Sequence, residues 1–223
     1  GFGCVLFHSL AVSGHFYYLL RKIMWFITVP ILMIMYDYFK VPIDALYFNN
    51  PLRPLVGMRN TIIDLIQWGA RYDVKQFPGL WLIEAHFDKI REEFLKSSPK
   101  KYYFHEEDPW FEVNERYYFH KVKDFPLLNS LVNQIPSVHK ETTRFAVVEG
   151  PMVIAPHRAE TNLLLRYHLT IQGNGDCTLY TESGSHVHDE GEAFIFDHAR
   201  YHELIKTGES KRVVLILDIH RCL

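Results

Sequence analysis

The sequence predicts a mainly β member of the α+β class: an antiparallel double-sheet barrel or jelly roll with flanking helices and an apolar N-terminal segment. Three observations support this. From residue 143 onward, short stretches rich in β-branched and aromatic residues alternate with glycine-containing turns. Amphipathic segments with helical spacing come before the strands, which favours helices packed outside the sheets. Residues 1–40 are almost entirely apolar.

Residues 1–40 form the expected membrane-associated segment. Two apolar runs, 3–20 and 23–36, are separated by Arg21 and Lys22. The first run is near the length that spans a bilayer, while the second is shorter and contains Pro30, which suits an interfacial or re-entrant segment. A pair of buried core helices is the alternative. Basic residues after the first run favour a cytosolic position for the following domain.

The rest of the chain divides into a linker and one domain. Residues 41–75 are rich in proline and asparagine and contain a short stretch of helical spacing at 60–72, and residues 76–223 are the expected domain. Patterning places its elements as follows: helices at 77–97 and 126–135, and strands at 114–122, 143–149, 163–171, 177–180, 192–197 and 212–219.

Composition excludes several classes of protein. Hydrophobic residues make up 48% of the chain, which excludes a disordered polypeptide, and a formal net charge of -2 argues against a nucleic-acid partner. The three cysteines are too few and too scattered for a disulfide framework or a cysteine metal site. We therefore expect a reducing compartment, which suits a ferrous cofactor.

Two arginines occupy unusual places in expected strands. Alternation along 163–171 puts Leu165 and Tyr167 on one face and Arg166 and His168 on the other. A buried mid-strand arginine needs a partner, and an anionic ligand in a barrel mouth would supply one; simple solvent exposure is the alternative. Arg212 opens an otherwise apolar strand, so it either faces solvent or reaches inward to hold a carboxylate.

Two histidines flank the central strands. His157 follows Ala155–Pro156 and His202 follows Tyr201, and such positions converge at one mouth of a jelly roll. Two neutral imidazoles suit a non-haem ferrous centre, which usually adds a carboxylate two residues after the first histidine; here that residue is Ala159. Ordinary surface histidines are the alternative. The sequence predicts that His186 and His188, in a turn-like segment, are solvated.

The segments HRAETNLLLRYHL (157–169), EGEAFIFDHARYHE (190–203) and RVVLILDIHR (212–221) closely resemble the aspartyl/asparaginyl β-hydroxylases. These are Fe(II)- and 2-oxoglutarate-dependent dioxygenases with a double-stranded β-helix fold. The likeness covers roughly residues 77–221. In the family's peptide hydroxylases a glycine stands two residues after the first histidine, and two histidines alone hold the iron.

The resemblance implies a role for six residues. His157 and His202 would be the catalytic iron ligands, Arg212 would bind the distal carboxylate of 2-oxoglutarate, and His168 would contact this cosubstrate. Arg166 would lie beside it and touch the cosubstrate or the substrate. Asp197 resembles a residue that orients the site from behind the ligands, with a turn-forming aspartate as the alternative.

Within the family, the bacterial lipid A 2-hydroxylases look more similar than the lumenal peptide hydroxylases. They too are short and begin with an apolar membrane segment, and they share the L-R-Y-H-L strand. They typically read H-R-D-P where this chain has His157, Arg158, Ala159 and Glu160, so their third ligand is missing here.

The sequence thus predicts a membrane-associated hydroxylase using Fe(II), 2-oxoglutarate and O2. Its substrate would be a lipid acyl chain or a peptidyl Asp/Asn at a membrane, with succinate and CO2 released. A catalytically weak or inactive membrane-tethered member, acting as a ligand- or partner-binding module, is the main alternative, supported by Ala159. A zinc hydrolase is a third, although no glutamate is positioned as an obvious general base.

Overall fold

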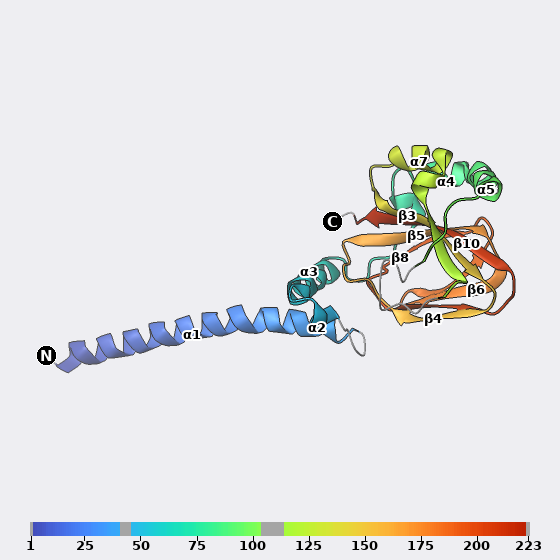
Figure 1. Cartoon of the computed structure of the whole chain (residues 1–223). Coiled ribbons are helices and arrows are strands. Elements are labelled where there is room, and N and C mark those ends of the chain that lie inside the picture. Colours follow the sequence, from blue (N-terminus) through green and yellow to red (C-terminus); the bar gives the residue numbers. More distant parts are fainter. Residues whose placement is uncertain (1, 41–45, 104–113, 222–223) are drawn as a thin grey trace. The chain divides into compact units, whose positions relative to one another are not determined.

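The computed structural model describes residues 2–40, 46–103 and 114–221 (Figure 1). It forms two compact units, residues 1–68 and 69–223. The division falls inside the 41–75 segment that the sequence analysis treated as a linker with a short helix. Pro42 of that segment lies outside the described residues.

The first unit is helical. It contains α1 (Phe2–Tyr38), α2 (Leu46–Asn49) and α3 (Arg53–Ile66), with Pro54 in the first turn of α3, where its missing N–H is not needed. Within the described residues, one helical stretch, Tyr17–Tyr38, is long and apolar enough to cross a membrane, and its most apolar 18 residues are not buried.

The prediction of two separate apolar segments was wrong, because α1 is continuous and contains Pro30. Arg21 and Lys22 are good helix formers, so their charge interrupts the hydrophobic run without interrupting the backbone. Proline removes one helical hydrogen bond, and exposed apolar helices of this kind tolerate that loss.

The second unit has two antiparallel sheets. The six-stranded sheet has the order β1-β2-β3-β10-β5-β8 and the four-stranded sheet the order β4-β9-β6-β7. The strands are β1 (Tyr102–Tyr103), β2 (Tyr117–Lys121), β3 (Val138–Glu149), β4 (Met152–His157), β5 (Leu164–Gln172), β6 (Asn174–Thr181), β7 (Gly184–Asp189), β8 (Ala193–Phe196), β9 (His202–Lys206) and β10 (Lys211–His220). This confirms the predicted mainly β, double-stranded β-helix fold.

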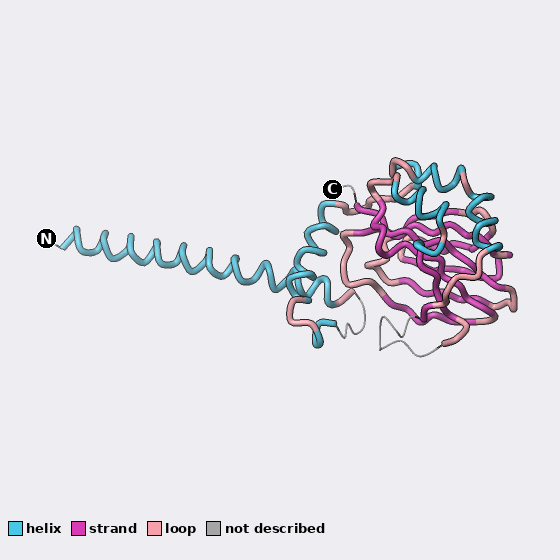
Figure 2. The backbone as a smooth tube through the Cα atoms, turned by 45° about the horizontal axis from the view of Figure 1, so that its top comes forward, coloured by secondary structure: helices cyan, strands magenta, loops and turns pink. Residues whose placement is uncertain are grey.

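Helices cover one face of the six-stranded sheet. In Figure 1, α4 (Leu80–Ala85), α5 (Phe87–Lys96) and α7 (Pro126–Asn133) lie over β3, β5 and β10, with the smaller sheet on the other side. Figure 2 shows the same arrangement, with the cyan helices of this unit gathered at one side of the magenta strands. Two single-turn 3-10 helices, Val74–Gln76 and Val122–Asp124, complete the layer.

Alternation along the central strands builds the main core. Leu165, Tyr167 and Leu169 of β5 are buried beneath the helices, as are Val213, Leu215, Leu217 and Ile219 of β10. They pack against helical residues that include Leu80, Ile83, Ile90, Leu128 and Leu131. The opposite face of β5 and β10, which carries Arg166, His168 and Arg212, therefore turns toward the smaller sheet.

The predicted single helix at 77–97 is two helices. The chain breaks at His86, whose backbone (φ -106°, ψ 15°) is not helical and whose Nδ1 contacts the carbonyl oxygen of Leu82 at 2.9 Å. The break lets both segments follow the sheet while keeping Leu80, Ile83 and Ile90 fully buried. Apolar periodicity alone did not reveal it, because the spacing continues across the break.

Candidate metal centre

His157 and His202 face each other across two neighbouring strands of the smaller sheet. His157 is the last residue of β4 and His202 the first of β9, and the two are directly paired in the antiparallel register. Their ring centroids are 4.2 Å apart. The structure thus brings together the two imidazoles that the sequence placed at one mouth of the barrel.

Hydrogen bonds to the main chain define which nitrogen each ring presents. Nδ1 of His157 lies 2.9 Å from the carbonyl oxygen of Ala155, and Nδ1 of His202 lies 2.9 Å from that of Arg200. A carbonyl oxygen can only accept, so each Nδ1 carries the hydrogen and donates it. Nε2 of each ring therefore keeps its lone pair, as a metal ligand requires.

Both rings are neutral at physiological pH. Burial lowers the pKa of His157. Burial and the neighbouring His157 lower the pKa of His202 to about 3. Removing an imidazolium from water is unfavourable, and two adjacent positive rings would repel each other. The pair is thus held in the form that binds a cation.

The candidate metal site has two histidines and, among the described residues, no third ligand beside them. Within the described residues no group of three or more His, Cys, Asp or Glu side chains could hold a metal ion together. Ala159 has no ligating atom in its side chain, and its backbone N–H donates to the carbonyl oxygen of His198 at 2.8 Å. A metal ion bound by His157 and His202 would therefore have its remaining coordination positions filled by small ligands.

Arg212 is a buried cation on the inner face of β10. It is 2% exposed, and no ion pair joins it to a carboxylate within the described part of the chain. Its Nη2 donates to Nε2 of His188 at 3.0 Å, while its buried Nε has no hydrogen-bond partner there. A buried guanidinium with unused donors is costly unless an anion occupies the space beside it.

His188 corrects the sequence analysis, which predicted that it was solvated. It lies on strand β7 and is 0% exposed, while His186 is partly buried and stacks on Phe194 with 4.3 Å between ring centroids. Burial and Arg212 lower the pKa of His188 to about 2, so the ring stays neutral and accepts from the guanidinium. Glycine and serine beside a tight turn concealed a short, half-buried strand.

A row of ring contacts connects the histidine pair to Arg212. Phe196 lies 5.2 Å from His202 and 5.1 Å from His168, measured between ring centroids. Nδ1 of His168 approaches Nε2 of His188 at 3.4 Å. Nε2 of His168 is buried without a hydrogen-bond partner in the described residues, and burial lowers the pKa of this histidine well below its usual value.

Arg166 is fixed by a carboxylate of the neighbouring strand. Asp218 lies opposite Arg166 in the β5–β10 register, and its two oxygens accept from Nε and Nη2 of Arg166 at 2.8 and 3.1 Å. Burial opposes ionisation of Asp218, but the guanidinium prevails and lowers the pKa of this carboxyl to about 2. Arg166 still adds positive potential near the histidines, since it helps to lower the pKa of both His157 and His202.

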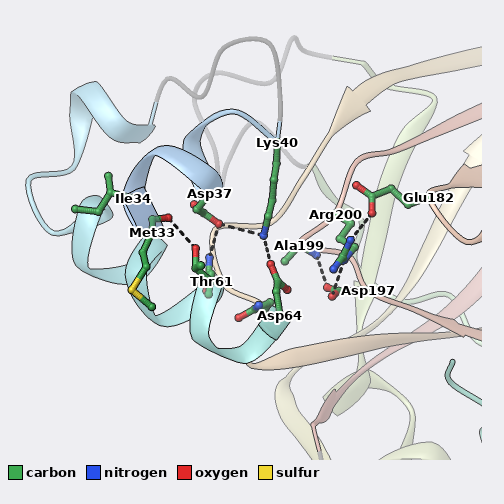
Figure 3. A network of polar contacts seen from close by, with 12 residues as sticks. Met33, Ile34, Asp37, Lys40, Thr61, Asp64, Glu182, Asp197, Ala199 and Arg200 are labelled. Atoms are coloured by element: carbon green, nitrogen blue, oxygen red, sulfur yellow. Dashed lines mark hydrogen bonds and ion pairs between the residues drawn. The ribbon is translucent and has the colours of Figure 1, made fainter. Parts of the chain in front are cut away.

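Asp197 organises the turn that leads to His202. One of its carboxylate oxygens accepts from the backbone N–H of Ala199 at 3.1 Å, and the other pairs with Arg221 at 2.7 Å and Arg200 at 3.5 Å (Figure 3). The same turn presents the Arg200 carbonyl that receives the His202 hydrogen. The two sequence interpretations of Asp197 are therefore compatible, because forming the turn also orients the ring.

His198 was not singled out from the sequence. It is 3% exposed, and burial and the charge of Arg166 lower its pKa well below the usual value. Its carbonyl holds Ala159, the second residue after His157. Nothing in the local sequence distinguishes it from a surface histidine, because its charged neighbours, which include Arg166 and Asp218, come from distant strands.

Comparison with known families decides the relationship of this chain. The family model described as aspartyl/asparaginyl beta-hydroxylase matches residues 84–222, more than half of the chain. The chain belongs to the aspartyl/asparaginyl β-hydroxylase family. No curated protein matches it in a sequence search.

Several solved cupin structures resemble this β-hydroxylase family member in part. The Cnp3 cupin domain of Schizosaccharomyces pombe is 10% identical, with a TM-score of 0.35 and coverage of 51% of this chain and 71% of that one. A predicted oxalate decarboxylase from Thermotoga maritima is 9% identical, with a TM-score of 0.37 and coverage of 57% and 96%. KdgF from Halomonas sp. is 14% identical, with a TM-score of 0.33 and coverage of 54% and 95%.

The family match includes every site residue expected from the sequence. His157, Arg166, His168, Asp197, His202 and Arg212 all lie inside residues 84–222. The helices α1, α2 and α3 lie outside it. The β-hydroxylase family membership therefore supports a hydroxylase domain, while the helical unit is a separate feature of this chain.

Proposed function

We propose that this chain is a membrane-anchored, Fe(II)- and 2-oxoglutarate-dependent hydroxylase. Its substrate would be a lipid acyl chain or a peptidyl Asp/Asn held at the membrane, and succinate and CO2 would be released. The observation that carries the proposal is the paired histidines: two neutral rings, opposite each other in neighbouring strands, each oriented by a contact between its Nδ1 and a main-chain carbonyl oxygen.

The protein atoms fit a ferrous ion that has only two protein ligands. His157 and His202 would hold the metal through Nε2, and imidazole nitrogen is a suitable donor for iron. When bound, iron with 2-oxoglutarate supplies the oxidative chemistry that inserts one oxygen atom into an unactivated C–H bond. The absence of a protein carboxylate leaves more coordination positions for small ligands.

Arg212 would bind the distal carboxylate of 2-oxoglutarate. Its charge is buried, has no carboxylate partner in the described residues and keeps an unused Nε donor. A planar guanidinium donates two parallel hydrogen bonds to a carboxylate, which fixes both position and orientation. His188, neutral and accepting from Nη2, holds the guanidinium in place without neutralising it.

Phe194 and Phe196 would keep water out of the space between the metal ligands and Arg212. Phe196 is 1% exposed, and its ring meets those of both His168 and His202. Phe194 contacts His168 and His188 at 5.3 and 5.4 Å between ring centroids. An apolar lining would strengthen the electrostatic attraction between Arg212 and a carboxylate and would keep water out of the site.

Replacing a ligand tests the proposal directly. We expect His202→Ala to abolish stoichiometric Fe(II) binding and 2-oxoglutarate-dependent succinate formation in protein purified without air, because one imidazole cannot retain the metal alone. His220→Ala is the matched control, since His220 is an exposed histidine at the end of β10. Unchanged iron content in His202→Ala would overturn the assignment.

The alternative, an inactive family member that binds a ligand, has Ala159 as its support. Assays on the same purified protein distinguish the hydroxylase from the inactive member. If it binds Fe(II) and 2-oxoglutarate but forms no succinate in the presence of membranes, the alternative holds. A mass gain of one oxygen on membrane lipids or membrane proteins supports the hydroxylase and identifies the substrate class.

We also propose that residues 69–223 face the cytosol. Cys177 is a buried free thiol, and ferrous iron persists in a reducing compartment. Protease digestion of intact cells and of opened cells would distinguish the two orientations.

A further inference from the structure

Helix α3 has the opposite polarity to a helix on the surface of a soluble domain. Its buried residues are mostly polar or small: Arg53, Gly57, Asn60, Thr61, Ile63 and Asp64. Its exposed side chains are large and apolar: Leu55 is 62% exposed, Ile62 44%, Leu65 58% and Ile66 67%. The expectation in water is the reverse, with the apolar face inward.

The polar face of α3 forms hydrogen bonds and ion pairs with residues of α1 and α2 and with Lys40. Nη2 of Arg53 lies 2.8 Å from Oδ2 of Asp37, and Tyr47 donates to the same carboxylate at 2.7 Å. Thr61 donates to the carbonyl oxygen of Met33 at 2.8 Å, and Lys40 pairs with Asp64 (Figure 3). The positive charges of Arg53 and Lys40 therefore offset the negative charges of Asp37 and Asp64 inside the helical unit.

Close helix packing completes this polar interior. A Cβ atom on Gly57 would lie 2.0 Å from the hydroxyl oxygen of Tyr47, so only glycine fits there. The Tyr47 ring lies under the guanidinium of Arg53, with 4.4 Å between Cζ and the ring centroid. Small residues that let helices approach, together with polar groups that satisfy each other internally, are characteristic of helices packed in lipid.

We infer that α3 is a second membrane-contacting element, which lies in the bilayer interface with its apolar face among the acyl chains. The inference rests on the membrane anchoring by α1 proposed above. With 14 residues, α3 is about 21 Å long, too short to span a hydrocarbon core of about 30 Å. It contacts α1 at Met33 and Asp37, near the C-terminal end of the apolar span Tyr17–Tyr38, and Lys40 just after that end.

A bilayer suits this surface better than another protein does, because the surface continues that of α1. Leu32 of α1 is 55% exposed and Met35 45%, beside the contacts with α3. Phe48 and Trp68, at 74% and 75% exposure, flank α3 in sequence, and aromatic residues concentrate at the membrane–water boundary.

Nitroxide labels in the full-length protein, reconstituted in phosphatidylcholine/phosphatidylglycerol nanodiscs, test this placement. Cys4 and Cys222 are replaced by serine, and Cys177 stays because it is buried. Labels are attached at Ile62→Cys, at Phe26→Cys in mid-α1 and at Val153→Cys in β4. Phe26 is 85% exposed and Val153 66%, so all three labels are accessible.

We expect the label at position 62 to collide with oxygen at least several-fold more often than with a water-soluble nickel chelate, and the label at 153 to show the reverse. Nickel access at 62 would overturn the inference, as would protection from both reagents or dipolar broadening, which indicate coverage by protein or by a second copy. Lipid contact at 26 without lipid contact at 62 would refute only the role of α3. Nickel access at both would refute the anchor as well.

Discussion

His157 and His202 each donate Nδ1–H to a carbonyl oxygen two residues earlier in the chain. This local geometry needs no long-range partner to set the tautomer, so both rings are oriented before any metal arrives. Preorganised ligands lose little entropy on binding. The turn built by Asp197 contributes to the same preorganisation, because it positions the carbonyl of Arg200.

Arg212→Lys distinguishes the effect of the positive charge from that of the guanidinium geometry at the proposed 2-oxoglutarate site. Lysine keeps a positive charge but cannot donate two parallel hydrogen bonds, so we expect the Kd for 2-oxoglutarate to rise by roughly 10- to 100-fold, from charge-assisted bonds worth about 1.5–3 kcal/mol. Titration of the Fe(II)-loaded protein with 2-oxoglutarate, without air, measures this Kd. Lys211→Ala, one residue earlier and exposed, should leave the Kd unchanged; an equal loss in both variants would contradict the role of Arg212.

At the residue scale, the sequence predicted the histidine pair and the arginine but not their surroundings. His157, His202 and Arg212 stand in recognisable segments, whereas His188 and His198 acquire their roles from distant strands. His188 meets Arg212, which is 24 positions later, and His198 is buried near Asp218. Local composition does not report such contacts, because they depend on how the two sheets face each other.

At the scale of elements, the strand pattern predicted β2, β5, β8 and β10 closely, because these strands are strongly apolar or aromatic. It predicted only part of β3 and half of β6, and no strand for β1 or β4. The short strands β7 and β9 are polar on one face and escaped this pattern. Periodicity also predicted the buried face of the 77–97 segment but not its division at His86. At that break the backbone of His86 leaves the helical conformation and its side chain contacts the carbonyl of Leu82.

The helix α5 offers a stability test with a control in the same element. Ile90 is 0% exposed and belongs to the main core, so Ile90→Ala should lower the free energy of unfolding by about 2–5 kcal/mol through lost burial and a cavity. Leu95→Ala, at a position that is 54% exposed, should change it by about 0.5 kcal/mol or less. Urea denaturation measures both. Equal effects would mean that α5 does not pack as described.

At the scale of the whole molecule, buried neutral histidines make stability depend on pH. Burial lowers the pKa of His188 to about 2 and, with His157, that of His202 to about 3. The unfolded chain binds these protons near pH 6.5 and the folded chain does not. The contribution of these neutral histidines to the free energy of unfolding is therefore fully present above pH 6.5. It falls as the pH drops toward 3.

Each such histidine contributes a slope of about 1.4 kcal/mol per pH unit in the metal-free protein. We expect His188→Gln to reduce the slope of unfolding free energy between pH 6 and 4 by about this amount, since one proton fewer is taken up on unfolding. Denaturant titrations at several pH values measure the slope. His220→Gln, at an exposed position, should preserve it; identical slopes in wild type and His188→Gln would contradict the expectation.

The division at Trp68–Gly69 has a practical consequence. All three hydrophobic clusters lie within residues 69–223, and so do the six expected site residues. One exposed stretch of backbone at Gly69 and Ala70 joins this unit to the helices. A protease site inserted there would release residues 69–223, the β-hydroxylase family domain, with its interior complete, so that its chemistry can be studied without the apolar helices.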